Sequence, residues 1–242
     1  MRRRYGISVG LLTGLLLVAC RSGNESQRPP LEPVVHPPLA TDCVGATDAA
    51  HQAVYLHGMM PVQSVESAAQ ERILPAETAL LDRLGKELNI RFAIPYSKSL
   101  CRNSSTHFCW GTAEPVSVAH VYADIRPSVQ ACFAANASWG VIGFSNGGYH
   151  AGRVIAQGHL PQPSWAIAIG SAGAMDTIQP TPAARSTPFY LLIGTADVTR
   201  SSAQHFYNAL YEQGFNVQYR EFAGGHELDE NALRATLQEI LK

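Results

Sequence analysis

Residues Trp139–Tyr149, with the sequence WGVIGFSNGGY, carry the strongest indication of the fold. This stretch begins as an apolar run, ends in small residues, and has the spacing Gly143-x-Ser145-x-Gly147 at its centre. This spacing is typical of a nucleophile elbow, in which a buried strand turns sharply into a helix and exposes a serine hydroxyl above the sheet edge. Glycine on both sides of the serine removes the Cβ atoms that would clash in so tight a turn. Apolar residues then recur at helical spacing, which predicts a helix after the serine.

The composition indicates one folded domain with a sizeable core. The chain has 242 residues, of which 46% are hydrophobic and 15% charged, and its formal net charge is −1. Chains of this size in α/β folds often form a single domain. The sequence has no clustered basic face, zinc-finger spacing or glycine-rich phosphate loop, which argues against nucleic acid as a partner and against a metal site.

The N-terminus is typical of a targeting segment. Arg2, Arg3 and Arg4 precede an apolar run over 7–18. That run is too short to cross a membrane comfortably but suits the core of a signal peptide. It ends in Leu-Val-Ala-Cys at 17–20, which resembles a bacterial lipobox. The resemblance implies that residues 1–19 are removed and that Cys20 is lipidated, whereas the alternative is an ordinary signal peptide with an incidental cysteine.

The residue after the lipobox cysteine carries a sorting signal in Gram-negative lipoproteins, where aspartate favours the inner membrane. Arg21 stands there instead, so the resemblance implies a lipid-anchored protein of the bacterial cell envelope, at the outer membrane. Loss of residues 1–19 removes three arginines and no acidic residue, which leaves 15 Lys and Arg against 19 Asp and Glu, a net charge of −4.

Residues 20–42 are predicted to be a tether, and residues 43–242 the folded domain. Prolines at 29, 30, 33, 37 and 38 stand among small and polar residues. Such a segment cannot bury enough apolar surface to offset its ordering entropy, and its prolines favour an extended spacer.

Strands alternate with helices from residue 53 to the end. Besides the elbow strand and helix, the patterns predict strands at 53–56, 90–95, 165–169, 189–193 and 217–222, and helices at 75–88, 119–134, 201–213 and 229–241. This alternation predicts an α/β fold with a mostly parallel central sheet and helices on both faces. Ligands of such sheets bind beyond the carboxyl ends of the strands. Ser145, Asp197 and His226 each follow a predicted strand.

At these residues the chain resembles the α/β-hydrolase superfamily, over residues 50–242. The matching pieces are His57-Gly58 after a strand, the elbow at Ser145, Gly-Thr-Ala-Asp ending at Asp197, and Gly-Gly-His ending at His226. The order serine, aspartate, histidine is that of the superfamily. The resemblance implies an α/β-hydrolase fold and a serine hydrolase.

In that chemistry Ser145 is the nucleophile, because a serine hydroxyl activated by a base can attack a carbonyl carbon. His226 is the base, and Asp197 orients it and stabilises the imidazolium. The oxyanion needs fixed donors, for which we expect the backbone N–H groups of Asn146 and Met59. His57 is expected to brace the oxyanion loop rather than to act as a base. The resemblance implies no metal or organic cofactor.

Each of these residues also has a simpler interpretation. Ser145 could be only a turn serine, and His226 only a surface histidine. Asp197 could cap the helix that begins near Ser201, since aspartate is a common N-cap. Asp176 also follows a strand and is the reserve candidate for the acid.

The cysteines allow more than one pairing. With Cys20 lipidated, four remain: Cys43, Cys101, Cys109 and Cys132. An even number in an oxidising compartment favours disulfides, with three connectivities. We prefer Cys101–Cys109, with Cys43–Cys132 as the remainder. The alternative is that Cys132, on an apolar helix face, is a buried free thiol.

The segment between the strands near Gly170 and Phe189 is short and holds prolines at 180, 182 and 188. It leaves no room for a cap domain, so we expect an open site that accepts a small-molecule or polymeric substrate. Candidates for an apolar wall are Met59, Met60, Phe108, Trp110 and Tyr149.

The Gly147-Gly148 doublet and the Phe108-Cys109-Trp110 loop resemble the polyhydroxybutyrate-depolymerase and feruloyl-esterase-like branch of the superfamily. That resemblance implies hydrolysis of carboxylic esters through an acyl-enzyme. One alternative is a serine peptidase of prolyl-oligopeptidase type, which shares the elbow with a double glycine. Another is a non-catalytic binding lipoprotein on a hydrolase scaffold, against which the intact serine, aspartate and histidine set argues.

Overall fold

A computed structural model describes residues 41–62, 74–97, 99–101, 104–110, 118–135, 137–157, 163–173 and 181–242, without the side chains of 118–124. The predicted signal peptide, the lipidation of Cys20 and most of the predicted tether lie outside these residues. No helix among them is long and apolar enough to cross a membrane.

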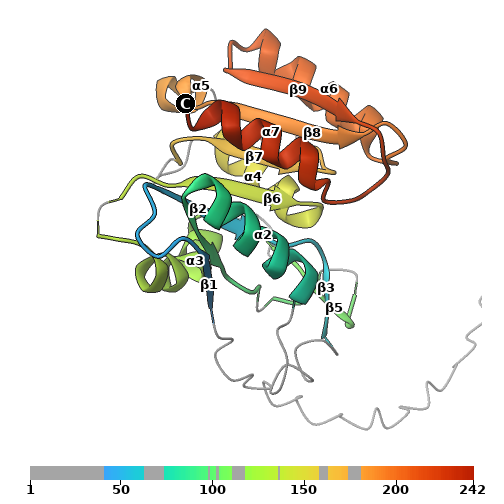
Figure 1. The fold of residues 1–242 in the computed structure, drawn as a ribbon. Helices are drawn as coiled ribbons and strands as arrows, with labels where there is room; N and C mark the ends of the chain where they lie inside the picture. Colours follow the sequence, from blue (N-terminus) through green and yellow to red (C-terminus); the bar gives the residue numbers. More distant parts are fainter. Residues whose placement is uncertain are drawn as a thin grey trace, which may run out of the picture. The chain divides into compact units, whose positions relative to one another are not determined.

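The core of the fold is a seven-stranded sheet in the order β1-β4-β2-β6-β7-β8-β9 (Figure 1). Its strands are β1 (Asp42–Gly45), β2 (His51–Leu56), β4 (Ile90–Ile94), β6 (Gly140–Phe144), β7 (Ala166–Ile169), β8 (Phe189–Gly194) and β9 (Val217–Phe222). All neighbours are parallel except β1, which pairs antiparallel with β4 at one edge. The predicted mostly parallel sheet is therefore confirmed.

Helices cover both faces of this sheet. They are α2 (Pro75–Leu88), α3 (Val118–Cys132), α4 (Asn146–Gln157), α5 (Pro182–Ser186), α6 (Arg200–Glu212) and α7 (Glu230–Ile240). One face packs against α2 and α7, and the other packs against α3, α4, α5 and α6 (Figure 1). The predicted α/β layering is confirmed.

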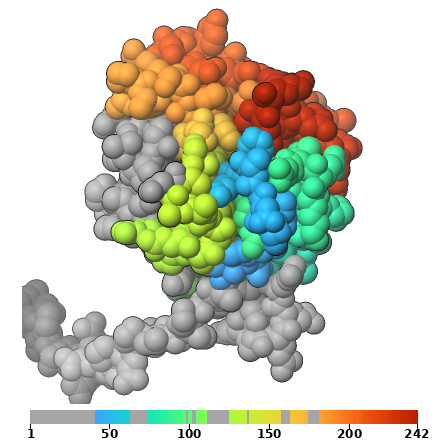
Figure 2. Space-filling view, turned by 60° about the vertical axis from the view of Figure 1, so that its left-hand side comes forward, coloured from blue at the N-terminus to red at the C-terminus, as the bar shows by residue number. Residues whose placement is uncertain are grey.

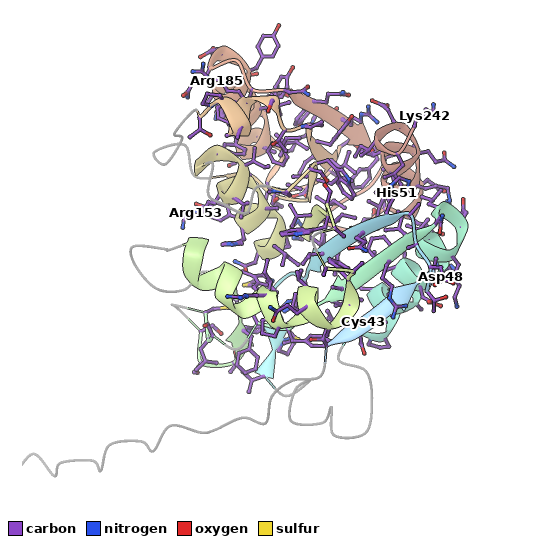
Figure 3. The ribbon with its side chains drawn as sticks, turned by 90° about the vertical axis from the view of Figure 1, so that its left-hand side faces the viewer. Cys43, Asp48, His51, Arg153, Arg185 and Lys242 are labelled. Carbon is purple, nitrogen blue, oxygen red and sulfur yellow. A yellow bond between two sulfur atoms is a disulfide. The ribbon has the colours of Figure 1, made fainter. Side chains whose placement is uncertain are left out.

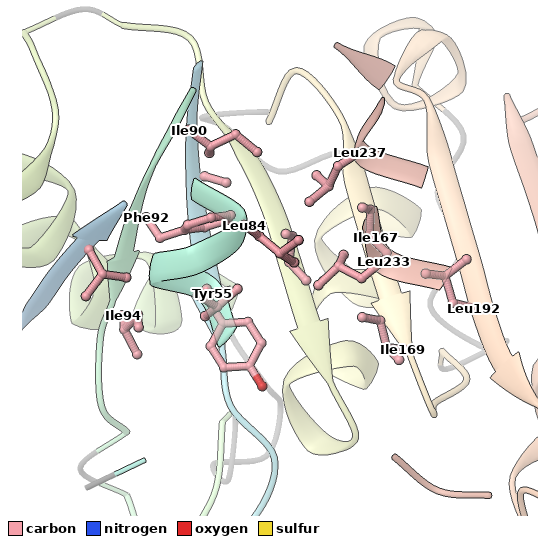
Figure 4. Close-up of a cluster of buried hydrophobic side chains, with 14 of the residues drawn as sticks. Tyr55, Leu84, Ile90, Phe92, Ile94, Ile167, Ile169, Leu192, Leu233 and Leu237 are labelled. Carbon is pink, nitrogen blue, oxygen red and sulfur yellow. The ribbon is translucent and has the colours of Figure 1, made fainter. Parts of the chain in front are cut away.

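Alternation along each strand divides the core between the two faces. In β2, Ala53 and Tyr55 belong to the cluster that includes Leu84 of α2 and Leu233 of α7 (Figure 4). The intervening Val54 and Leu56 belong to the cluster on the other face. Because successive side chains of a strand point to opposite faces, a strand buried on both sides is a continuous apolar run. Each large side chain buried in this way stabilises the fold by about 1.5–3 kcal/mol.

The helix boundaries follow from local signals. α2 has Pro75 at its first turn and ends at Asn89, whose φ of 56° is left-handed. Asp229 caps α7 by accepting a hydrogen bond from the N–H of Ala232. α2 and α7 lie side by side (Figure 2). Exposed ion pairs such as Arg83–Glu230, at 2.7 Å, join the two helices, although pairs in water contribute little to stability.

Several short elements were not predicted. They are β1, α5, and the two-residue strands β3 (Met60–Pro61) and β5 (His107–Phe108), which pair antiparallel. Strands this short show no recognisable alternation in the sequence. β1 is covered by α2 and α3, and a disulfide between Cys43 and Cys132 ties it to α3 (Figures 2 and 3). The alternative of a free Cys132 thiol is therefore wrong.

Candidate active site

The turn at Ser145 has the backbone of a nucleophile elbow. Ser145 has a φ of 53°, in the left-handed region that residues with a side chain rarely adopt. It stands between β6 and α4. A Cβ on Gly143 would lie 2.2 Å from the carbonyl oxygen of Gly147, and a Cβ on Gly147 would lie 2.0 Å from that of Leu56. The two glycines therefore permit a turn that no larger residue would fit.

The structure brings Ser145, His226 and Asp197 into one hydrogen-bonded chain. Ser145 Oγ lies 2.9 Å from His226 Nε2, and His226 Nδ1 lies 3.0 Å from Asp197 Oδ2. The three residues follow β6, β9 and β8 at the carboxyl edge of the sheet. An ionised carboxylate only accepts hydrogen bonds, so His226 Nδ1 carries the proton and Nε2 is free to accept from the serine hydroxyl. This is the arrangement that a serine nucleophile and its base require.

Asp197 uses each carboxylate oxygen for a different contact. Oδ2 faces His226, whereas Oδ1 accepts hydrogen bonds from the backbone N–H and the hydroxyl of Thr199, at 2.7 and 2.8 Å. Burial alone would raise the pKa of Asp197, but the hydrogen bonds from Thr199 and His226 outweigh it and hold this pKa below its usual value. The N-cap of α6 is Thr199 rather than Asp197, so the simple capping interpretation is wrong.

Gly170, at the end of β7, is part of the site although sequence reasoning did not single it out for this role. Its φ is 60°, and a Cβ there would lie 3.2 Å from both Asp197 Oδ2 and the ring of His226. The absence of a side chain lets the carboxylate and the imidazole meet. A glycine directly after a buried strand was the only signal available in the sequence.

His57 is fully buried and holds the loop after β2. Its Nδ1 lies 2.5 Å from the carbonyl oxygen of Gly58, and its Nε2 accepts a hydrogen bond of 3.1 Å from the N–H of Ser97. Burial lowers the pKa of His57 to about 4, against the opposing effect of the hydrogen bond to Gly58. The ring is thus neutral at pH 7, with its proton on Nδ1. His57 therefore connects the loop after β2 to Ser97, and the part of this loop in an oxyanion hole stays a prediction.

The two residues expected to supply the oxyanion donors both belong to segments next to the serine. Asn146 is the first residue of α4, so its backbone N–H has no partner within the helix. Met59 follows Gly58, at which a Cβ would lie only 3.2 Å from Ser145 Cβ. The loop that carries Met59 therefore passes directly beside the nucleophile.

A second disulfide, Cys101–Cys109, closes a hairpin beside the same loop, as preferred from the sequence. The hairpin carries β5, which pairs with β3 so that Met60 lies opposite Phe108. This pairing buries both side chains in the core, where Met60 is 1% and Phe108 2% exposed.

The expected apolar wall therefore needs a correction. Met60, Phe108 and Trp110 are buried, whereas Met59 and Tyr149 are 60% and 37% exposed. Val198, next to Asp197, is a further exposed apolar residue at 91%. The pairing of β3 with β5 turns Met60 and Phe108 inward, and no pattern in the sequence predicts that pairing.

Other expectations concern what surrounds the site. Asp176, the reserve acid, lies outside the described residues. Of the segment between β7 and β8, the described part contains only the short helix α5. Among the described residues no group of three or more histidine, cysteine or acidic side chains could hold a metal ion.

No protein-family model and no curated protein matches the sequence. Solved structures do match. The chain is similar to esterase PE8, with a TM-score of 0.59 and 16% identity over 83% of this chain and 98% of that one. It is also similar to SOBER1 of Arabidopsis thaliana, with a TM-score of 0.57 and 16% identity over 79% and 99%. A carboxylesterase of Bacillus cereus matches with a TM-score of 0.59 and 12% identity over 82% and 92%.

The chain has the α/β-hydrolase fold. At these identities the similarity establishes the fold, and the chemistry rests on the site itself.

Proposed function

We propose that the chain is a serine hydrolase that cleaves carboxylic esters through an acyl-enzyme. The observation that carries this proposal is the continuous hydrogen-bonded chain from Ser145 Oγ through His226 to Asp197, with distances of 2.9 and 3.0 Å. Ser145 is the nucleophile, His226 the base and Asp197 the orienting acid.

In the first half-reaction His226 Nε2 takes the hydroxyl proton as Ser145 Oγ bonds to the ester carbonyl carbon. The π electrons of the carbonyl move to its oxygen, which the N–H groups of Met59 and Asn146 stabilise. His226 then gives the proton to the leaving alkoxide as the C–O bond breaks. Water repeats the sequence on the acyl-enzyme, releasing the acid and restoring Ser145.

Two observations favour an ester over a peptide. Esterase PE8 and a carboxylesterase of Bacillus cereus are among the similar structures. Three large apolar residues beside the site are also exposed, namely Met59, Tyr149 and Val198, while the exposed acidic residue Glu227 directly follows His226. The three apolar residues suit an uncharged acyl or alcohol group of the substrate. The finer placement in the polyhydroxybutyrate-depolymerase and feruloyl-esterase-like branch rests on the Gly147-Gly148 and Phe108-Cys109-Trp110 motifs.

The test is fluorophosphonate labelling of the full chain in detergent, with the adduct mapped by mass spectrometry. We expect an adduct on Ser145 that is lost in Ser145→Ala and in His226→Ala. An unlabelled but folded protein would contradict the proposal and favour a non-catalytic binding lipoprotein.

The substrate class is tested separately with a panel. It comprises p-nitrophenyl esters of increasing acyl length, methyl ferulate, polyhydroxybutyrate and a prolyl p-nitroanilide peptide. Ester turnover without peptide turnover is the expected result. Faster cleavage of the peptide would replace the esterase proposal with the peptidase alternative.

We further propose that Cys20 is lipidated and that the domain is anchored at the outer membrane of a bacterial envelope. The Leu-Val-Ala-Cys sequence at 17–20 and Arg21 support this assignment. Labelled palmitate should enter the full chain but not Cys20→Ser, and the wild type should sediment with outer membranes. Equal labelling of both proteins would contradict the proposal.

A further inference from the structure

Trp110 lies between the two segments that would form the oxyanion hole. It directly follows the Cys101–Cys109 hairpin and is only 3% exposed. Its indole Nε1 donates a 3.0 Å hydrogen bond to the carbonyl oxygen of His57, and its backbone N–H donates a 2.7 Å bond to Asn146 Oδ1. A single buried residue thus contacts both the loop that carries Met59 and the helix start at Asn146.

The first contact helps to fix the direction of the loop's N–H groups. In a planar trans peptide the C=O and the next N–H point in opposite directions. Trp110 Nε1 holds the carbonyl of His57, and His57 Nδ1 holds the carbonyl of Gly58. With the Gly58 carbonyl held towards the buried ring, the N–H of Met59 points away from it. The indole and imidazole rings also pack together, with centroids 5.0 Å apart.

The second contact holds the other donor. Asn146 is the first residue of α4, and its side-chain oxygen is occupied by the N–H of Trp110. This contact anchors the residue whose own backbone N–H faces no helical partner. Oxyanion donors act only when they are fixed where the negative charge develops, so the distance between the two segments matters as much as their presence.

Trp110 is itself held by the bridged hairpin. Ser97 Oγ donates to the carbonyl oxygen of Cys109, and the N–H of Cys109 donates to the carbonyl oxygen of Ser99, at 2.9 Å. The same Ser97 donates its N–H to His57 Nε2. Ser97 therefore links His57 of the oxyanion loop to Cys109, the residue beside Trp110.

We infer that Trp110 is a positioning residue, which sets the separation and direction of the Met59 and Asn146 N–H donors. The inference rests on the proposed function, because it gives Trp110 a role in the same hydrolysis. Trp110 does not touch the substrate; it acts through His57 and Asn146. Its role therefore differs from the wall position expected from the sequence.

The test is Trp110→Phe in the full chain, which keeps the backbone N–H and most of the ring but deletes the indole donor. A missing oxyanion donor costs about 100- to 1,000-fold in kcat, so a displaced donor should cost about 10- to 100-fold. We expect kcat for a p-nitrophenyl ester to fall by that factor, with KM within about threefold of wild type. Affinity for a trifluoromethyl ketone, whose hemiketal oxygen occupies the same hole, should fall by the same factor as kcat/KM.

The matched control is Trp165→Phe. Trp165 is a buried tryptophan, 7% exposed, that directly precedes the amino end of β7, whereas the candidate site lies at the carboxyl ends of the strands. The control variant should alter stability without altering kcat or the affinity for the ketone. If Trp110→Phe retains kcat within twofold, or loses ketone affinity no more than Trp165→Phe, the inference is wrong.

A second variant serves if Trp110→Phe does not fold. Asn146→Ala removes the side-chain acceptor but keeps the backbone N–H. It should show the same parallel loss of kcat and ketone affinity, and unchanged values would overturn the inference. Where both variants fold, the double variant should lose less than the product of the two single losses, because both act on one network.

The labelling experiment separates this inference from the proposed function. If fluorophosphonate fails to label wild-type Ser145, the proposed function itself fails. If it labels wild type and Trp110→Phe at equal rates, the hydrolase proposal stands and only the role of Trp110 is refuted.

Discussion

The proposed acid–base side and the proposed oxyanion side of the candidate site are built in different ways. The acid–base side places Ser145, Asp197 and His226 on turns that directly follow three parallel strands. Its geometry depends on backbone conformation, such as the left-handed φ of Ser145 and Gly170. The proposed oxyanion side instead depends on the contacts of His57 with Ser97 and Trp110, and on the Cys101–Cys109 disulfide next to Trp110. Activity should therefore fall when the backbone of the acid–base side shifts slightly. On the oxyanion side, activity should fall when contacts between segments far apart in the chain are lost.

The largest effect is expected on the acid–base side. Asp197→Asn keeps the shape of the side chain but no longer fixes the proton on His226 Nδ1, so kcat should fall by about 10⁴-fold. Steady-state kinetics on a p-nitrophenyl ester measures it. The control Asp229→Asn changes an aspartate that caps α7 and should leave kcat unchanged. A fall of less than tenfold would mean that another acid, with Asp176 the first candidate, performs this role.

Removing each disulfide in turn should show different effects on stability and on activity. By loop entropy, removing Cys43–Cys132, which are 89 residues apart, should lower the free energy of unfolding by about 4.5 kcal/mol. Removing Cys101–Cys109, which are 8 residues apart, should lower it by about 2.5 kcal/mol. Paired alanine variants are compared by urea unfolding and by kcat. At a temperature where both are folded, only the Cys101–Cys109 variant should lose activity, and equal kcat values would refute the special role of the hairpin.

His57, on the oxyanion side, should also make the stability of the fold depend on pH in the acidic range. Burial lowers the pKa of His57 to about 4, so the folded state binds this proton less readily than the unfolded state, whose histidines titrate near 6.5. The contribution of His57 to the free energy of unfolding is fully present above pH 6.5. As the pH falls towards 4, the free energy of unfolding should decrease by about 3 kcal/mol. His150, whose pKa burial and nearby Arg153 lower to about 3, should add to the same trend.

Urea unfolding of wild type at pH 7.0, 5.5 and 4.5 measures this loss. His57→Gln should flatten the dependence on pH, even though it lowers stability at neutral pH. The control His205→Gln changes an exposed histidine of α6 and should leave the dependence as it is in wild type. Identical pH slopes for His57→Gln and wild type would show that His57 is not the source.

The smallest of these effects is expected from a change at Gly170, where a side chain would displace the residues of the acid–base side. Gly170→Ala would place a Cβ 3.2 Å from Asp197 Oδ2 and from the His226 ring, so it should displace the pair and lower kcat by about 100-fold. Gly214→Ala is the matched control, because Gly214 also has a positive φ but nothing lies within 4 Å of its Cβ position. It should cost only backbone strain, seen as a lower Tm. Equal kcat losses in both variants would point to strain alone.

Most of the fold could be predicted from the sequence because long elements carry periodic signals. The helix over 75–88 and the strand over 217–222 have the predicted bounds, and the other predicted elements differ by one or two residues at their ends. The antiparallel strand β1 and the pairing of β3 with β5 could not be predicted. β3 and β5 have two residues each, too few to show alternation, and β1 has none of the continuous apolar character of the central strands, so their pairing depends on their partners.

The meeting of Ser145, Asp197 and His226 could be predicted from the order of the strands. A parallel sheet brings the ends of its strands to one edge, so residues that follow those strands lie close together. The roles of Gly170 and Ser97, and the proposed role of Trp110, became visible only in the folded structure. Their roles come from contacts between segments far apart in the chain, such as Trp110 with His57, 53 residues away. Neither residue type nor local spacing encodes a contact of that kind.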